Sequence, residues 1–136
     1  MYAERKRTKG LTIVADATLS NIDIICDKTR IFLNEFGLSS IEFQTLISLR
    51  EALCNAVIHG SNSDYRKKIF FQIKINGKSL IIEIEDQGEG FNWKSINNEI
   101  PDSSLESGRG LAIIKHHFGR LRYNKKGNKI ILEKFL

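Results

Sequence analysis

The chain has 136 residues, of which 41% are hydrophobic and 27% charged, so it is long enough for one domain with a core of ordinary composition. No apolar stretch approaches the roughly 20 residues that span a bilayer, and no apolar segment follows the basic N-terminus as it would in a secretion signal. These features predict a soluble cytoplasmic protein with no membrane partner. The net charge of +5 is spread along the chain without interleaved aromatic residues, which argues against direct binding to nucleic acid.

The N-terminal part of the chain predicts an arm, a strand and a helix. Residues 1–8 are expected to form a flexible arm, and residues 9–136 a single domain. A short strand is expected over residues 11–15. Apolar residues then recur at steps of three and four over residues 19–36, which predicts an amphipathic helix that ends at Gly37.

A second helix is expected to begin at Ser39 or Ser40, to run to about His59 and to end at Gly60. The rest of the chain predicts two strand pairs separated by a patternless loop and a helix. The expected ranges are strands 69–75 and 80–85 around Asn76-Gly77, loop 91–107, helix 110–118, and strands 120–123 and 129–135. This order, βααββαββ, predicts the α+β class, with a layer of helices on a mixed sheet.

A polar stripe runs along the second predicted helix. At about 3.6 residues per turn, Glu51, Asn55 and His59 share one face, and Ser48 and Gln44 extend it backwards. A carboxylate facing a cleft can accept a proton from an attacking hydroxyl, and an amide oxygen can bind Mg²⁺ without adding charge. The alternative is that the stripe is the solvated side of the helix, but such sides are usually rich in Lys, Glu and Arg.

Two glycine-containing segments supply further candidate residues. Asp86 ends a predicted strand, where its carboxylate can accept a hydrogen bond from the amine of adenine, and Gly88 and Gly90 allow a close backbone approach. The alternative is a plain turn after the strand. Gly108, Arg109 and Gly110 precede the last predicted helix, whose free N–H groups attract phosphate. The alternative there is a hinge. Neither a Walker A motif nor a Rossmann fingerprint occurs.

Taken together, three segments resemble the N, G1 and G2 boxes of the GHKL, or Bergerat-fold, ATPase superfamily. The segments are EALCNAVIHG, DQGEGF and GRGLAII. The His-Gly end of the first box and the GRGL opening of the last helix are most similar to the anti-sigma factor serine/threonine kinases. The resemblance implies a two-layer α/β sandwich, with helices packed on one face of a mainly antiparallel sheet.

The resemblance also implies roles for individual residues. Glu51 would be the general base, Asn55 would hold Mg²⁺ against the phosphates of ATP, and Asp86 would bind the adenine amine. Residues 91–107 would form a lid over ATP. The residues expected to contact the nucleotide are Asn55, His59, Asp86, Gly88, Gly90, Gly108, Arg109, Gly110 and Leu111. The resemblance departs at Gly127-Asn128-Lys129-Ile130, where many relatives carry a threonine close to the adenine.

The implied function is an anti-sigma factor that also acts as a kinase. Such proteins sequester a sigma factor, phosphorylate a STAS-domain antagonist on serine or threonine, and act as homodimers. The alternative is a nucleotide-binding regulatory module that sequesters a partner without phosphoryl transfer. The catalytic half of a histidine kinase is disfavoured, because no helical hairpin with a phosphorylatable histidine precedes the domain.

Overall fold

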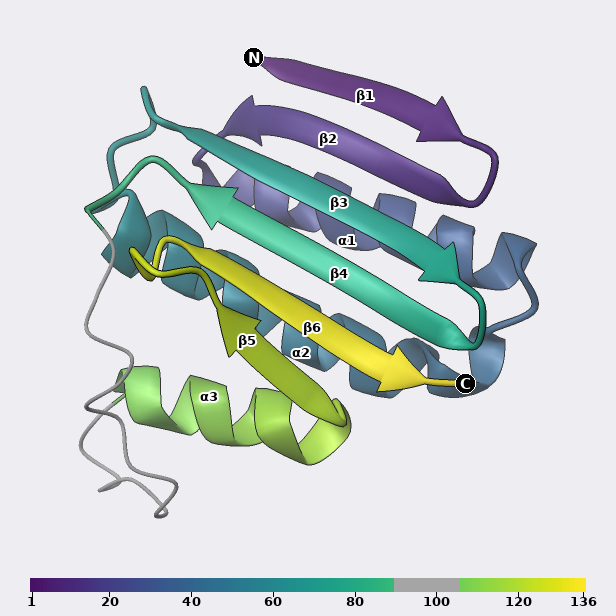
Figure 1. Cartoon of the computed structure of the whole chain (residues 1–136). Coiled ribbons are helices and arrows are strands. Elements are labelled where there is room, and N and C mark those ends of the chain that lie inside the picture. The colour runs from purple at the N-terminus through teal and green to yellow at the C-terminus, as the bar shows by residue number, and fades with distance from the viewer. Residues whose placement is uncertain (90–105) are drawn as a thin grey trace.

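In the part of the chain that the structure describes, six strands form one sheet in the order β1-β2-β3-β4-β6-β5, and three α-helices cover one of its faces (Figure 1). The structure, a computed structural model, describes residues 1–89 and 106–136, and of residues 106–110 it describes the backbone alone. The strands are β1 (Tyr2–Arg7), β2 (Gly10–Asp16), β3 (Lys68–Asn76), β4 (Ser79–Asp86), β5 (Arg120–Tyr123) and β6 (Lys129–Phe135). All strand pairs within the described ranges are antiparallel. The prediction of an α+β sandwich is confirmed.

In the described residues, the helical layer contains two long α-helices, one shorter α-helix, one 3₁₀ turn and one π-helical turn. These are α1 (Leu19–Glu35), the 3₁₀ turn η1 (Ser39–Ile41), α2 (Glu42–Asn55), the π-helical turn η2 (Ala56–Gly60) and α3 (Glu106–His117). α2 packs against both α1 and α3. None of the helices in the described part of the chain is long and apolar enough to span a membrane.

The core lies between the helices and the inward face of the sheet. Alternate residues of the central strands are almost completely buried, since side chains of a strand point to opposite faces in turn. On β4, Leu80, Ile82 and Ile84 are 0–1% exposed, and the next residue on the same face is Asp86. The same alternation that builds the core therefore directs a carboxylate towards the helical layer at the end of the strand.

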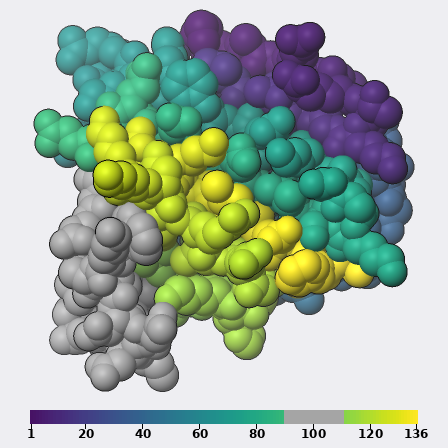
Figure 2. Space-filling model, in the orientation of Figure 1, coloured from purple at the N-terminus to yellow at the C-terminus, as the bar shows by residue number. Residues whose placement is uncertain are grey.

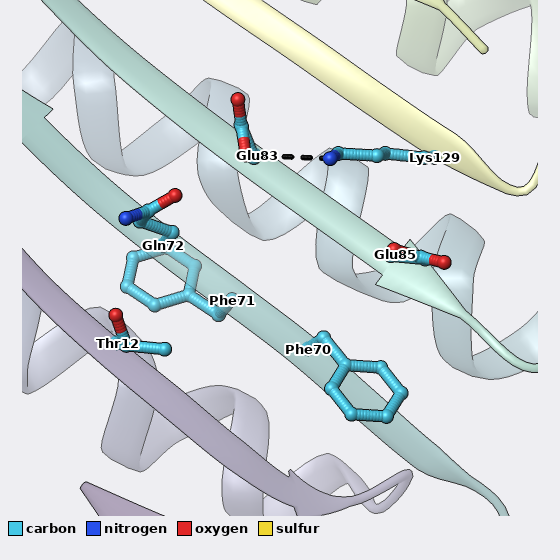
Figure 3. Close-up of a pocket in the computed structure, with 7 residues that line it drawn as sticks. All are labelled: Thr12, Phe70, Phe71, Gln72, Glu83, Glu85 and Lys129. Atoms are coloured by element: carbon cyan, nitrogen blue, oxygen red, sulfur yellow. Dashed lines mark ion pairs between the residues drawn. The ribbon is translucent and has the colours of Figure 1, made fainter. Parts of the chain in front are cut away.

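Within the residues that the structure describes, no helix lies on the other face of the sheet, and side chains from the strands form its surface (Figure 2). A depression of about 150 Å³ lies on this face, beside the Glu83–Lys129 ion pair, whose atoms are 3.5 Å apart (Figure 3). Glu83 and Glu85 line it from β4. Because they alternate with Ile84 and Asp86, this depression lies on the opposite side of the sheet from the predicted nucleotide site.

Residues 2–7 differ from the sequence-based prediction of a flexible arm. They form β1, which pairs with β2 from Tyr2 opposite Ala15 to Arg7 opposite Gly10. Five of the six residues are exposed, so the strand shows no apolar alternation for a sequence pattern to detect. The backbone ladder holds this edge strand, and its charged side chains protect an edge that would otherwise offer free N–H and C=O groups to another chain.

Candidate functional site

The predicted site residues that the structure describes lie on or next to α2, η2, β4 and α3, at one end of the molecule (Figure 1). In Figure 1, α2 and β4 both end on the left, and α3 begins there. The contacts support this view, because η2 packs against β4 and α2 packs against α3. Three elements that are separated along the sequence thus lie at the same end of the molecule (Figure 1).

The polar stripe of α2 is mostly covered. Ser48 is 0% exposed, whereas Glu51 and Asn55 are half-buried. Ser48 Oγ and Gln44 Oε1 are buried without a hydrogen-bond partner. Buried polar atoms normally have partners, so ordered water is the partner expected for these two atoms. The burial of these four residues argues against the solvated-face alternative for this part of the stripe, because a solvated face would be exposed.

The end of the stripe departs from the predicted α-helix. After Asn55 the chain widens into η2, where the Ser61 N–H donates to Ala56 O, five residues back, at 2.7 Å. The i, i+4 spacing that placed His59 on the line of Glu51 and Asn55 applies to an α-helix, whereas η2 has the wider π pattern. His59 is exposed. The α-helical spacing used in the prediction therefore extends only to Asn55, where the hydrogen-bond pattern changes.

Asp86 is wedged between two glycines. An ideal Cβ on Gly60 would lie 2.1 Å from Asp86 Oδ2, and one on Gly88 would lie 1.9 Å from Gly60 O. Both contacts are far shorter than any real Cβ contact. Glycine is therefore required at both positions for η2 to approach the end of β4. The sequence predicted Gly60 as the end of the helix and as the last residue of the first box, and its contact with Asp86 becomes visible only once β4 is placed beside it.

The Asp86 carboxylate is held in a poorly solvated position. It is 8% exposed, and Oδ1 accepts a hydrogen bond from the Gly88 N–H at 2.7 Å. Burial raises the pKa of Asp86 above its ordinary value, and the hydrogen bond from Gly88 opposes this shift. A carboxylate offers about four acceptor sites. The bond from Gly88 uses one of these sites, and another can accept from an amine such as that of adenine.

Substituting Gly60 with alanine is expected to displace Asp86 and lower both stability and nucleotide affinity. The added methyl group would overlap the carboxylate, and overpacking of this kind costs about 1–3 kcal/mol. Urea denaturation would measure the loss in the free energy of unfolding. Alanine at Gly119, where a Cβ would lie 3.9 Å from its nearest neighbour, is the matched control. Equal effects of the two substitutions would contradict the steric argument.

The raised pKa of Asp86 gives a pH-dependent prediction. The folded state binds the proton more tightly than the unfolded state, so ionisation of Asp86 destabilises the fold once the pH exceeds the ordinary pKa. Asp86→Asn is therefore expected to raise the free energy of unfolding at neutral pH. The gain should shrink as the pH falls through the raised pKa. Denaturation curves across this pH range test the sign, and a variant less stable than wild type at neutral pH would contradict it.

The third predicted segment is only partly described. α3 begins at Glu106, four residues before the predicted start, so Gly108, Arg109 and Gly110 lie within the helix and not ahead of it. Gly108 and Arg109 still fall in the first turn, whose N–H groups lack helical acceptors. Leu111 is 5% exposed. Gly90 and the predicted lid at 91–107 lie outside the described residues, except for the backbone of residues 106 and 107 in α3.

The donor set fits Mg²⁺ held mainly by a nucleotide. Within residues 1–89 and 106–136, no group of three or more His, Cys, Asp or Glu side chains could hold a metal ion. Mg²⁺ commonly takes one or two protein oxygens and completes its shell with water and substrate phosphates. Asn55, half-buried and one helical turn after Glu51, offers such an oxygen.

These elements define an α+β domain with the candidate site residues at one end of its sheet (Figure 1). The sequence matches the histidine kinase-like ATPase domain family over residues 15–134, and the chain belongs to that family. This confirms the predicted superfamily. Domains of this family bind ATP, usually with Mg²⁺.

One solved structure with similarity to this chain is a histidine kinase domain. The chain is similar to the histidine kinase domain of the blue-light activated histidine kinase of Erythrobacter litoralis EL346, at 20% identity and a TM-score of 0.45. The alignment covers 70% of this chain and 43% of that one, so the chain corresponds to less than half of that domain. A comparison with curated proteins gives no match.

Proposed function

We propose that this protein is an ATP-dependent serine/threonine protein kinase of the anti-sigma factor type. It phosphorylates a STAS-domain antagonist, sequesters a sigma factor and acts as a homodimer. The observation that carries the proposal is the position of Glu51 and Asn55. Both are half-buried and lie one helical turn apart on α2, the helix that packs against α3. Membership in the histidine kinase-like ATPases supports the use of ATP.

Asp86, Asn55 and Glu51 have separate roles in the proposed phosphoryl transfer. Asp86, fixed between Gly60 and Gly88, orients the base by accepting from its amine. Asn55 offers an oxygen for Mg²⁺, which neutralises charge on the phosphates when bound. Glu51 takes the proton of the substrate hydroxyl while the hydroxyl oxygen bonds to the γ-phosphorus and the bond to ADP breaks. The products are a phosphorylated side chain and ADP.

A label-transfer experiment tests the proposal. The purified chain, γ-labelled Mg-ATP and a lysate of the source organism are expected to give one small labelled protein with the label on serine or threonine. Phosphoserine and phosphothreonine survive acid, whereas phosphohistidine does not, so acid treatment separates them. Acid-labile label would contradict serine/threonine specificity. A stable nucleotide-dependent complex without any label would instead indicate a sequestering module.

A further inference from the structure

The end of β4 is anchored to the β5–β6 turn by two asparagine side chains. Asn128 Nδ2 donates to Asp86 O at 2.9 Å, and the Asp86 N–H donates to Asn128 O at 2.9 Å. Asn124 Nδ2 in turn donates to Asn128 Oδ1 at 2.8 Å. The chain of bonds from Asn124 through Asn128 to Asp86 is here called the asparagine relay.

The asparagine relay supplies a hydrogen bond to Asp86 O that the backbone of β6 does not supply. The regular register between β4 and β6 ends with Glu85 opposite Lys129. The backbone N–H of Asn128 is directed into its own turn, where it donates to Asn124 Oδ1 at 3.1 Å. The side-chain amide of Asn128 therefore supplies the second bond to Asp86.

Asn124 holds the turn in the shape that this bond requires. Its Oδ1 accepts from the backbone N–H groups of Gly127, Asn128 and Lys129 at 2.8–3.2 Å. Gly127 adopts φ +84°, a conformation that glycine takes without strain. Asn124 and Asn128 are half-buried. The turn is thus a fixed support and not a free hairpin tip.

The opposite edge of β4 is fixed by a different bond. Gln87 Oε1 accepts from the Lys68 N–H of β3 at 2.7 Å. The backbone around Asp86 is therefore held from both neighbouring strands, while Gly60 and Gly88 confine its carboxylate. Of these supports, only the relay bonds the backbone of Asp86 itself through a side chain.

We propose that Asn124 and Asn128 are positioning residues for base recognition, which set how strictly the site selects a purine with a 6-amino group. This inference rests on the proposed function, because it assumes that Asp86 accepts from that amine. Hydrogen bonds to a charged group are sensitive to distance and angle. A small movement of the strand end is therefore expected to reduce selectivity before it removes binding of the triphosphate.

The test compares ATP with purine riboside triphosphate, which carries hydrogen in place of the 6-amino group. Wild type is expected to prefer ATP by about tenfold or more, the effect of one charged hydrogen bond. Asn128→Leu removes the donor to Asp86. Asn124→Asp keeps the oxygen that caps the turn but removes the donor to Asn128. Both variants are expected to lose most of the preference, while Lys125→Gln, in the same turn but outside the relay, keeps it.

The outcomes separate the inference from the proposed function. If the wild-type protein binds no ATP, both the proposed function and this inference are contradicted. If the wild-type protein prefers ATP and folded Asn128→Leu or Asn124→Asp keeps that preference, the inference about the asparagine relay is contradicted. The proposed function is then unaffected. Thermal denaturation identifies a variant that fails to fold, in which case the other variant decides. In an Asp86→Asn background, Asn128→Leu should not change the preference further, and a further change would place the role of Asn128 elsewhere.

Discussion

Replacing Glu51 by alanine is expected to lower phosphoryl transfer by about 10²–10⁴-fold, the usual contribution of a general base. Binding of Mg-ATP should persist, because base recognition depends on Asp86 and the metal contact on Asn55. Transfer of label from γ-labelled ATP to the phosphorylated partner gives the rate, and calorimetry gives the affinity. The separation of the two effects is the informative result, since a collapsed site would lose both.

Two further variants make the assignment of Glu51 specific. Glu51→Gln keeps the shape of the side chain but cannot take a proton at neutral pH, so it should be as inactive as the alanine variant. Glu42→Gln, at the first position of the same helix, removes an equal charge away from the site and should remain active. Undiminished transfer by Glu51→Gln would exclude Glu51 as the base.

Replacing Asp86 by asparagine is expected to weaken ATP binding by about 1–3 kcal/mol, because a charged acceptor is lost and an amide donor faces the amine of adenine. The same substitution is expected to stabilise the free protein at neutral pH, since burial raises the pKa of Asp86. Lower affinity combined with higher stability is the pattern of a residue retained for binding. Calorimetric titration with Mg-ATP measures the affinity.

Glu85 provides the matched control for Asp86. It lies one residue earlier on β4, and its side chain lines the depression on the open face of the sheet (Figure 3). Glu85→Gln removes the same charge from the same strand but on the opposite face. It should leave ATP affinity unchanged. Equal losses for Glu85→Gln and Asp86→Asn would show that only the overall charge of this strand matters.

The sequence predicted most of the fold because the core follows simple periods. Alternation on β3 and β4 and the three-four spacing of α1 each reflect burial on one side of an element. β1 was missed because its stability comes from backbone pairing at an exposed edge, which leaves no apolar pattern.

The candidate site was predicted less completely, for a different physical reason. Local spacing placed Glu51 and Asn55 on one face, since both lie within regular helix. His59 lies in a π-helical turn, and the residue types do not predict this change from α to π hydrogen bonding. Gly60 and Asn128 act through contacts with Asp86, which lies 26 and 42 positions away along the chain. Only the tertiary structure brings such contacts together.

The most direct test of the account is the structure of the protein with Mg²⁺ and a non-hydrolysable ATP analogue. We expect the 6-amino group of the base within hydrogen-bond distance of the Asp86 carboxylate. Asn55 should contact the metal, and the Glu51 carboxylate should face the γ-phosphorus. A base bound away from Asp86, or a nucleotide located outside the junction of α2, β4 and α3, would contradict the account.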